Sequence, residues 1–225
     1  MKRGDLIWGA SLAAIGIFLL YPATHAVFVG VNKAYPFIMG FVKFAVLATM
    51  GELLALRIVT GEWKQSVGLV WRAVIWGLLG VVIVLMFEVF ATGIMSAIKK
   101  GMLPAGHSQT ATFVTAFWIS TVMNLAFAPT FMALHRITDT YIDLAGGKFA
   151  NLSGVELRKV ISAIDWHGFV SFVVLKTLPL FWIPAHTVTF LLPPEYRVLA
   201  AAFLSIALGA ILAFAKRKPS IKRVK

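Results

Sequence analysis

The chain has 225 residues, of which 60% are hydrophobic and 13% are charged, and its mean hydropathy is +0.87. This composition excludes an ordinary soluble domain and is typical of an integral membrane protein. The sequence contains no cysteine, which excludes a disulfide framework, a thiolate nucleophile and a zinc–thiolate site.

Apolar stretches long enough to cross a bilayer recur along the whole chain. A hydrocarbon core about 30 Å thick requires roughly 20 apolar residues per helix. The expected spans cover residues 6–21, 35–56, 71–98, 110–134, 164–192 and 196–215. We therefore expect an all-α fold, a polytopic transmembrane helical bundle of about six spans that forms a single membrane domain over residues 1–225. Residues 1–33 would form an additional N-terminal span and loop, and residues 216–225 a basic tail.

The first span has a second interpretation as a signal peptide. Lys2 and Arg3 precede a short apolar core, and Thr24-His25-Ala26 resembles a weak cleavage site. Because threonine suits the outer small position of such a site poorly, an uncleaved helix is favoured. The segment contains Asp5 and lacks the Arg-rich and Ser-rich character of a transit peptide, which favours a bacterial origin.

The Lys and Arg residues are distributed unevenly about the spans. Of the 21, the side that carries both termini holds 15. By the positive-inside rule this side is cytoplasmic, and the net charge of +12 then reflects topology and contact with anionic lipid. We expect a multi-pass protein of the bacterial inner membrane with cytoplasmic termini, the alternative being an organelle membrane. Membrane lipids are expected partners, and nucleic acid is not.

Two amphipathic stretches connect the fourth and fifth spans. Apolar residues recur at helical spacing over residues 134–144, before Gly146-Gly147, and over residues 157–164, after a capping-box pattern of Ser153 and Glu156. Both stretches are expected to be helices on the cytoplasmic membrane surface.

Small residues follow one another at four-residue spacing in the last span. Ala201, Ser205, Gly209 and Ala213 form a stripe that allows another helix to approach closely. Packing inside the bundle is the favoured role of this stripe, and a homo-oligomer contact is the alternative.

Several polar residues fall inside the expected spans, where an unpaired charge costs several kcal/mol. At 1.5 Å per residue, Lys43 and Lys176 lie near the midplane, and Glu88 lies roughly 7 Å toward the outer side. Asn124 is also close to the midplane, and Glu52 lies toward the cytoplasm. We expect the first four to form one buried cluster. It either neutralises charge and ties helices together, or it lines an aqueous path that favours anions.

The fifth span carries an unusual number of prolines. Pro179, Pro184 and the Pro193-Pro194 pair each remove a backbone donor. We expect them to break this span and to free carbonyls near Leu175 and Leu180, which must then find partners in the protein or in water. A kinked packing helix is the alternative.

A third polar pattern has the spacing of metal ligands. His135, Asp139 and Asp143 follow one another on a single helical face and offer nitrogen and oxygen donors. A solvated helix surface explains them more readily, so no metal site is expected.

Catalytic motifs are weak. Asp165, His167 and Ser171 include the residue types of a hydrolytic triad, but no nucleophile turn or oxyanion hole accompanies them. No phosphate-binding glycine loop occurs either. We therefore expect no enzymatic activity, no catalytic residues and no cofactor.

An ordered set of motifs gives the chain a family resemblance. The segments Trp182-Ile183-Pro184, His186-x-x-Thr189-Phe190 and Pro193-Pro194-Glu195-Tyr196-Arg197 resemble the signature of the Mpv-seventeen and twenty-two-kilodalton peroxisomal membrane protein family. That signature has Trp-Pro, Gln-x-x-Asn-Phe, Val-Pro and a following Arg. Gly51-Glu52 and Phe127-Ala128-Pro129 resemble its Gly-Asp and Phe-Ala-Pro motifs, so the resemblance covers residues 35–215.

The chain departs from the family pattern at three places. His186 replaces a glutamine, Thr189 replaces an asparagine, and Met123-Asn124 replaces an Asp-Gln pair. Polar character is mostly kept, but the acid before Asn124 is lost.

The resemblance implies a channel or transporter for small solutes in an inner mitochondrial, peroxisomal or bacterial membrane. We expect small, preferentially anionic metabolites to pass through the bundle. The expected path residues are Lys43, Glu88, Asn124, Lys176 and His186. Pro179, Pro184 and Pro193 would provide the helix break, Trp182 and Arg197 would shape the outer part of the path, and Glu52 is an inner-side polar residue. The alternative is a non-transporting scaffold or lipid-binding protein.

Overall fold

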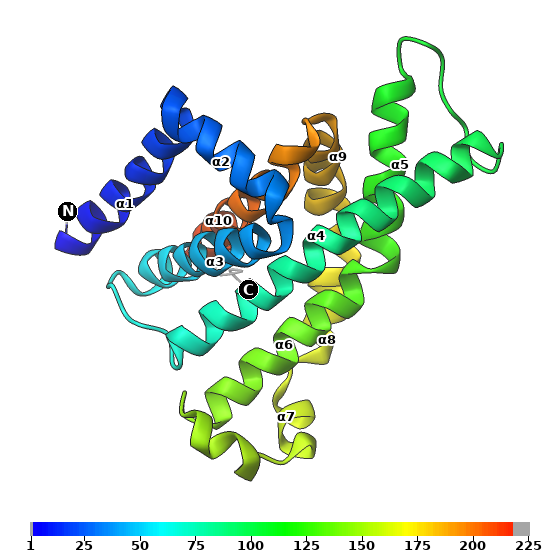
Figure 1. Cartoon of the computed structure of the whole chain (residues 1–225). Helices are drawn as coiled ribbons and strands as arrows, with labels where there is room; N and C mark the ends of the chain where they lie inside the picture. Colours follow the sequence, from blue (N-terminus) through cyan, green and yellow to red (C-terminus); the bar gives the residue numbers. More distant parts are fainter. Residues whose placement is uncertain (1, 218–225) are drawn as a thin grey trace, which may run out of the picture.

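The computed structural model describes residues 2–217, and this part of the chain consists of helices and the loops between them (Figure 1). Residues 218–225, most of the expected basic tail, lie outside the described residues. The helices, in chain order, are α1 (Arg3–Leu20), α2 (Pro22–Ala34), α3 (Pro36–Thr60), α4 (Leu69–Lys99), α5 (Ala111–Ala126), α6 (Ala128–Leu144), α7 (Leu157–Ala163), α8 (Trp166–Gly168), α9 (Ile183–Leu191) and α10 (Pro194–Arg217). A 3-10 helix, η1 (Phe149–Gly154), precedes α7, and a π-helix, η2 (Phe169–Trp182), joins α8 to α9.

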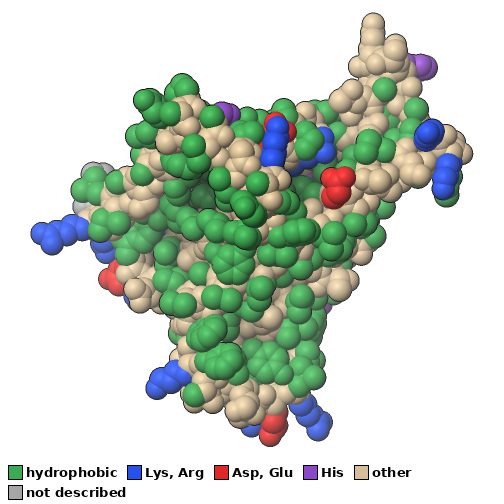
Figure 2. Space-filling view, viewed as in Figure 1, with side chains coloured by type: hydrophobic (Ala, Val, Ile, Leu, Met, Phe, Trp, Pro, Cys, Tyr) green, Lys and Arg blue, Asp and Glu red, His purple; other side chains and the backbone are tan. Residues whose placement is uncertain are grey.

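The expected all-α bundle of about six spans is confirmed. Within the described residues, five helical stretches are long and apolar enough to cross a membrane, and the bent pair of α5 and α6 provides a sixth. Figure 2 shows apolar side chains across the middle of one face of the molecule, whereas most charged side chains lie toward its edges. This arrangement agrees with the composition, because the middle of a bundle that spans a bilayer contacts hydrocarbon.

Helix α2 was not expected, since residues 22–34 were assigned to a loop. It begins with Pro22 in its first turn, where the missing N–H costs nothing. Figure 1 shows α1 and α2 as a hairpin beside the remaining helices. The hydroxyl of Tyr196 in α10 lies 2.9 Å from Nε2 of His25 in α2, so α2 is tied to the start of the last span.

Helix α3 is central to the bundle and packs on both α4 and α10. A methyl group added at Gly40 would lie 2.9 Å from the carbonyl oxygen of Gly80 in α4, and one at Gly51 would lie 3.1 Å from Cα of Ile206 in α10. Both positions therefore require glycine. Since α3 runs antiparallel to α4 and parallel to α10, we call the end of the bundle that holds Arg3 and Thr60 the terminal end, and the opposite end the distal end.

The small-residue stripe of α10 is used inside this chain. Ala201 and Ala213 are buried, and a methyl group at Gly209 would lie 3.1 Å from the carbonyl oxygen of Gly51 in α3. The stripe thus serves the packing role favoured by the sequence. The alternative, a homo-oligomer contact through Ala201, Ser205, Gly209 and Ala213, stays a prediction.

The proline break occurs in a different span from the one expected. Helices α5 and α6 meet at Phe127 with a bend of 47°. Pro129, in the first turn of α6, cannot donate to the carbonyl of Leu125 and its ring crowds that oxygen. The fourth expected span is therefore the bent one.

The fifth expected span is wound more widely and is not divided, so the expectation that its prolines break it is wrong. Residues Trp166–Leu191 form a single apolar helical stretch through α8, η2 and α9. Pro179 lies inside the π-helix and Pro184 at the junction of η2 and α9, so each leaves a carbonyl of the preceding turn without its usual backbone donor. Pro193 stands between α9 and α10. The π winding of η2 keeps the chain helical through Pro179, a residue that would kink an α-helix.

The helix expected near residues 157–164 is confirmed as α7, and its place on the cytoplasmic membrane surface stays a prediction. Val160 and the following Ile164 are buried, whereas Leu157 and Ile161, on the same apolar face, are exposed. An exposed apolar edge of this kind suits a helix that lies at a membrane surface.

Candidate functional site

A cavity of about 280 Å³ lies at the centre of the bundle, between α3, α4, α5, α6, α10 and the stretch from η2 to α9. Its walls are mainly apolar and aromatic, and they include Phe44, Trp76, Phe87, Phe127 and Phe131. Polar groups gather at its two ends. This pattern of an apolar body with polar ends is common in sites that hold small organic molecules.

The distal end of this central cavity holds a buried polar network. Asn124 is fully buried, and its amide nitrogen lies 3.1 Å from Nδ1 of His186 and donates to the carbonyl of Ser120 at 2.8 Å. The hydroxyl of Ser120 donates to the carbonyl of Ile183 at 2.7 Å. Trp182 stacks on His186, with 4.9 Å between ring centroids. The network joins α5 to α9 and satisfies groups that would be costly if left unpaired in lipid.

The terminal end of the central cavity holds a charged cluster on three helices. Arg72, only 9% exposed, lies 2.9 Å from Asp139, 2.6 Å from Asp143 and 3.7 Å from Glu52. His135 lies 3.6 Å from Asp139, and its ring packs against that of Trp76 at a tilt of 54°. We call Glu52, Arg72, His135, Asp139 and Asp143 the terminal cluster.

The terminal cluster corrects one interpretation of the sequence. His135, Asp139 and Asp143 were favoured as a solvated helix surface, but the side chains of His135 and Asp139 are only 12% and 16% exposed. Asp143, at 57%, fits the expected surface position. The four-residue spacing places all three on one face as expected, and the bend at Phe127 turns that face toward α3 and α4.

A second cavity, of about 290 Å³, lies toward the distal end. Lys43, Glu88 and Arg197 line it together with Asn32, and we call it the distal cavity. Lys43 is buried and donates to the side-chain oxygen of Asn32 at 2.6 Å. Asn32 in turn donates to the backbone carbonyl of Glu195 at 3.1 Å.

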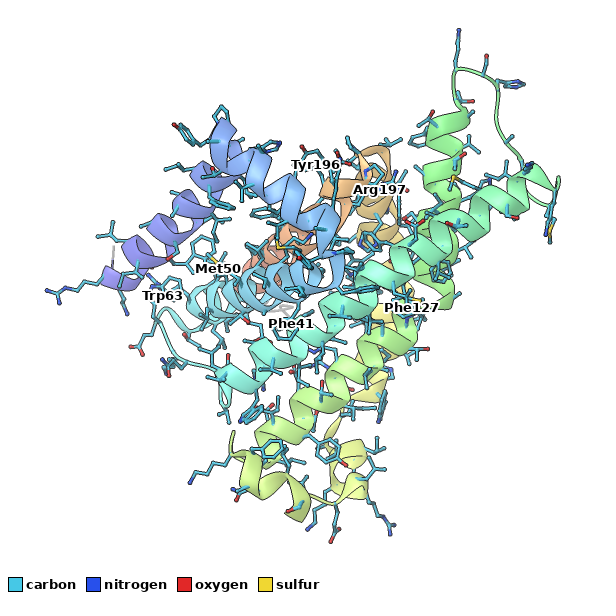
Figure 3. All side chains as sticks on the ribbon, viewed as in Figure 1. Phe41, Met50, Trp63, Phe127, Tyr196 and Arg197 are labelled. Atoms are coloured by element: carbon cyan, nitrogen blue, oxygen red, sulfur yellow. The ribbon has the colours of Figure 1, made fainter. Side chains whose placement is uncertain are left out.

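The charges of the distal cavity are not paired with one another. Within the described residues, Lys43 forms no ion pair shorter than 4.0 Å, and the exposed Glu88 accepts a hydrogen bond from Thr92 at 3.2 Å. Arg197 donates to the carbonyl of Leu192 at 3.0 Å, and Figure 3 shows it at the start of α10 beside Tyr196. The distal cavity therefore holds two cationic groups and one acid.

The two cavities lie end to end along the same three helices. The distal cavity is lined by Lys43 of α3 and the central cavity by the next residue, Phe44. In α10 the boundary falls between Val198 and Ala201, and in α4 Phe87 contributes to both cavities. Phe87 is 6% exposed. This ring is thus a shared wall between the two spaces.

Aromatic neighbours hold Phe87 in place. Its ring packs edge-on against His186 with 5.7 Å between centroids and lies 4.9 Å from the ring of Phe190. The guanidinium of Arg197 lies over Phe190, 5.6 Å from the ring centroid. The ring of Phe87 is consequently connected to a polar group of each cavity, His186 in the central one and Arg197 in the distal one.

The expected single cluster of Lys43, Glu88, Asn124 and Lys176 is wrong. Lys43 and Glu88 line the distal cavity, and Asn124 lines the central one. Lys176 is exposed and lines neither. Trp182 lies in the central cavity, and only Arg197 shapes the distal part of the expected path.

The π winding of η2 explains the position of Lys176. In a π-helix each N–H pairs with the carbonyl five residues earlier, so residues five apart share a face. Val170, Leu175 and Leu180 have this spacing and are 48%, 65% and 77% exposed. Lys176 follows Leu175 directly and lies on the same outer side, whereas an α-helical count had placed it at the core.

Sequence reasoning missed three residues of these sites. Asn32 was assigned to a loop, and Arg72 was counted only as a topology charge. Phe87 had no distinguishing pattern in an apolar span. For Arg72 a signal existed, because an arginine at the start of a long apolar helix needs a partner, and three acids at helical spacing were available.

The expectation of no hydrolytic triad is not tested by the structure, but Asp165 has a clear local role. Its side chain accepts a hydrogen bond from the backbone N–H of Gly168 at 2.8 Å and caps α8. Comparison of the whole chain with protein-family models, with curated proteins and with solved structures finds no match. The chemistry of the two cavities is therefore argued from this chain alone.

Proposed function

We propose that this chain is a membrane channel or transporter that passes small solutes, preferentially anions, through the central and distal cavities. The observation that carries the proposal is their end-to-end arrangement, with the single ring of Phe87 between them. A bundle that only packs helices together has no need of two aligned spaces along α3, α4 and α10. We infer that movement of the Phe87 side chain, which lines both cavities, would connect them.

The preference for anions is supported by the charges of the distal cavity. Lys43 is 6% exposed, and an ammonium in that position is costly unless a partner compensates it. Asn32 offers one neutral acceptor, so an incoming carboxylate or phosphate would supply the missing negative charge. Arg197 adds a second cation to the lining of the same cavity.

The proposed location is a bacterial inner membrane, with both termini cytoplasmic. Asp5 near the start of α1 contacts Arg57 near the end of α3, and α10 runs parallel to α3. The described ends of the chain therefore share the terminal end, which is the side that carries most Lys and Arg residues. Since the chain has no cysteine, single variants Lys64→Cys and Lys99→Cys can test this: an impermeant thiol reagent added to cells should label only Lys99→Cys.

We also propose that the chain belongs to the Mpv-seventeen and twenty-two-kilodalton peroxisomal membrane protein family. The resemblance rests on the motifs around Trp182, His186 and Phe127, and all three residues line the central cavity. An alignment of bacterial homologues that placed these motifs in register with the family would test this proposal.

The direct test is solute flux in liposomes. The purified full chain would be reconstituted, and efflux of small anionic, neutral and cationic solutes of matched size would be compared with protein-free liposomes. We expect anions to leave fastest. Efflux no faster than in protein-free liposomes would contradict transport, and faster efflux of cations would contradict the anion preference alone.

A lipid-binding function is the second candidate, because one observation favours it. The middle of the central cavity is lined by aromatic rings and could hold an acyl chain as well as a solute. Mass spectrometry of the purified protein distinguishes the two: a lipid retained in stoichiometric amount, together with absent flux, would favour lipid binding.

A further inference from the structure

The terminal cluster contains a set of donor atoms that the transport proposal does not use. One ligand atom each from Glu52, His135 and Asp139 lies within 4.8 Å of the other two. Glu52 comes from α3, and His135 and Asp139 are one turn apart on α6. Two helices thus direct one imidazole nitrogen and two carboxylate oxygens at a common point.

The charges around this point do not balance without a further cation. Arg72 is the guanidinium that contacts the acids, and it lies within 4.0 Å of Glu52, Asp139 and Asp143. Asp143 is 57% exposed, so water solvates its charge, and the one guanidinium faces two partly buried carboxylates, those of Glu52 and Asp139. Arg136 also borders the cavity, but its side chain is exposed and forms no ion pair shorter than 4.0 Å within the described residues. A bound cation would offset the remaining negative charge.

Unpartnered atoms provide a second, independent observation. Arg72 approaches Oε1 of Glu52 and Oδ1 of Asp139. The other oxygen of Glu52, Oε2, is buried and has no hydrogen-bond partner. Nδ1 of His135 is also unpartnered, although the other ring nitrogen, Nε2, is the one that lies near Asp139. Buried polar atoms almost always have partners, and a missing one calls for an explanation such as an ion.

The spacing of two of the donors suits direct coordination. Nε2 of His135 lies 3.6 Å from Oδ2 of Asp139. A metal about 2.1 Å from each of these two atoms would see them at an angle of about 120°, within the range that transition metals adopt. The third donor, from Glu52, lies within 4.8 Å of both residues' donor atoms. Trp76 packs against His135 with 4.1 Å between ring centroids and 54° between ring planes, and this contact restricts the imidazole.

We propose that Glu52, His135 and Asp139 bind a divalent transition-metal ion at the terminal end of the central cavity. One imidazole and two carboxylates suit ions such as Mn²⁺, Fe²⁺, Co²⁺ or Zn²⁺, with water completing the shell. All three side chains line the central cavity, so an ion can reach them from it. Arg72 holds the second oxygen of each carboxylate and acts as a positioning residue. The proposal is independent of transport.

The test is metal binding by the purified full chain, with any affinity tag removed and the protein treated with chelator. Co²⁺ binding would be measured by calorimetry. The quenching of tryptophan fluorescence by Co²⁺ would be measured separately in the wild type and in Trp76→Phe. We expect one site per chain and quenching that disappears in Trp76→Phe. Glu52→Gln and Asp139→Asn should each weaken binding by at least about 100-fold, more than is usual for a residue outside the ligand shell.

Matched controls separate coordination from general charge. Asp143→Asn removes a carboxylate that also contacts Arg72 but offers no proposed ligand, and it should change the affinity less than about threefold. His107→Ala removes an exposed histidine and should leave binding unchanged. Three results would each overturn the proposal: no Co²⁺, Mn²⁺ or Zn²⁺ binding by the wild type at millimolar concentration, equal loss in Asp143→Asn and Glu52→Gln, or quenching that persists in Trp76→Phe. If Glu52→Gln fails to fold, the comparison of Co²⁺ quenching between the wild type and Trp76→Phe still tests the proposed site.

Discussion

The replacement Lys43→Met tests the anion preference most directly. Methionine is similar to lysine in length and fills the same space without the charge. Lys43 is 6% exposed and lines the distal cavity, so an anion in that cavity would lie within a few ångströms of its ammonium. For unit charges about 5 Å apart, an effective dielectric constant of about 20 gives an attraction of about 3 kcal/mol.

The expected change in flux is smaller than the full attraction. Arg197 remains in the same cavity, and water at the open mouth screens the charge. Half to nearly all of the attraction, about 1.4 to 2.8 kcal/mol, corresponds to anion flux that is about 10- to 100-fold lower. Loss of the hydrogen bond to Asn32 is offset by removal of a buried charge, so the melting temperature in detergent should change little.

The assay is efflux of a radiolabelled small carboxylate from proteoliposomes, with a neutral solute of the same size measured in parallel. Lys176→Met is the matched control, because Lys176 is exposed and lines neither cavity, and its flux should stay within about twofold of the wild type. The reasoning is refuted if folded Lys43→Met carries anions as fast as the wild type. It is equally refuted if Lys176→Met loses as much flux as Lys43→Met.

Further predictions concern the shared wall, the helix contacts and the terminal cluster. Phe87→Ala should open the wall between the cavities and raise the flux of larger solutes several-fold. Phe113→Ala, at an exposed site outside both cavities, should leave this flux unchanged. Reduced flux in Phe87→Ala would contradict the role of the Phe87 ring as a barrier. Gly51→Ala places a methyl group 3.1 Å from the backbone of Ile206 and should cost about 1–3 kcal/mol of stability, while Gly93→Ala, in open space, should add up to about 1 kcal/mol. Thermal unfolding in detergent checks this pair, and equal melting temperatures would contradict it. Arg72→Met leaves three acids without their guanidinium and should cost about 3–5 kcal/mol, with a smaller loss in Arg72→Lys; an unchanged melting temperature in Arg72→Met would show that the acids need no cation.

Hydropathy was sufficient to locate the spans because each one had to match a fixed bilayer thickness. The packing role of the small residues in α10 was likewise predictable from the sequence, because two helices can approach closely only where their side chains are small. Helix α2 was missed because its residues 22–34 are too few to span the bilayer, and its helical state depends on contacts such as that of His25 with Tyr196. Local sequence does not contain those contacts.

The candidate site was only partly predictable for a related reason. Lys43, Glu88 and Asn124 do line cavities, but which of these residues lie in the same cavity depended on helix rotation, which the sequence does not specify. Lys176 was misplaced because no sequence rule announces a π-helix, and that winding shifts every face by a fraction of a turn. The terminal cluster needed knowledge of which face of α6 turns inward, and the bend at Phe127 sets this.

The attachment of α1 has a consequence for how this helix behaves in the bilayer. None of its residues is buried, and hydrocarbon solvates its apolar side chains about as well as neighbouring helices do. Its specific polar contacts are near its start. Asp5 accepts hydrogen bonds from Arg57 and Trp63, and the indole of Trp8 donates to the backbone carbonyl of Met50; Figure 3 labels Trp63 and Met50. At the other end it is held through α2 and the pair of His25 and Tyr196. Helix α1 is therefore attached to the bundle only near its two ends. We expect that loss of the contacts at Asp5 would let α1 move away from α3 into the lipid, while the remaining helices stay folded.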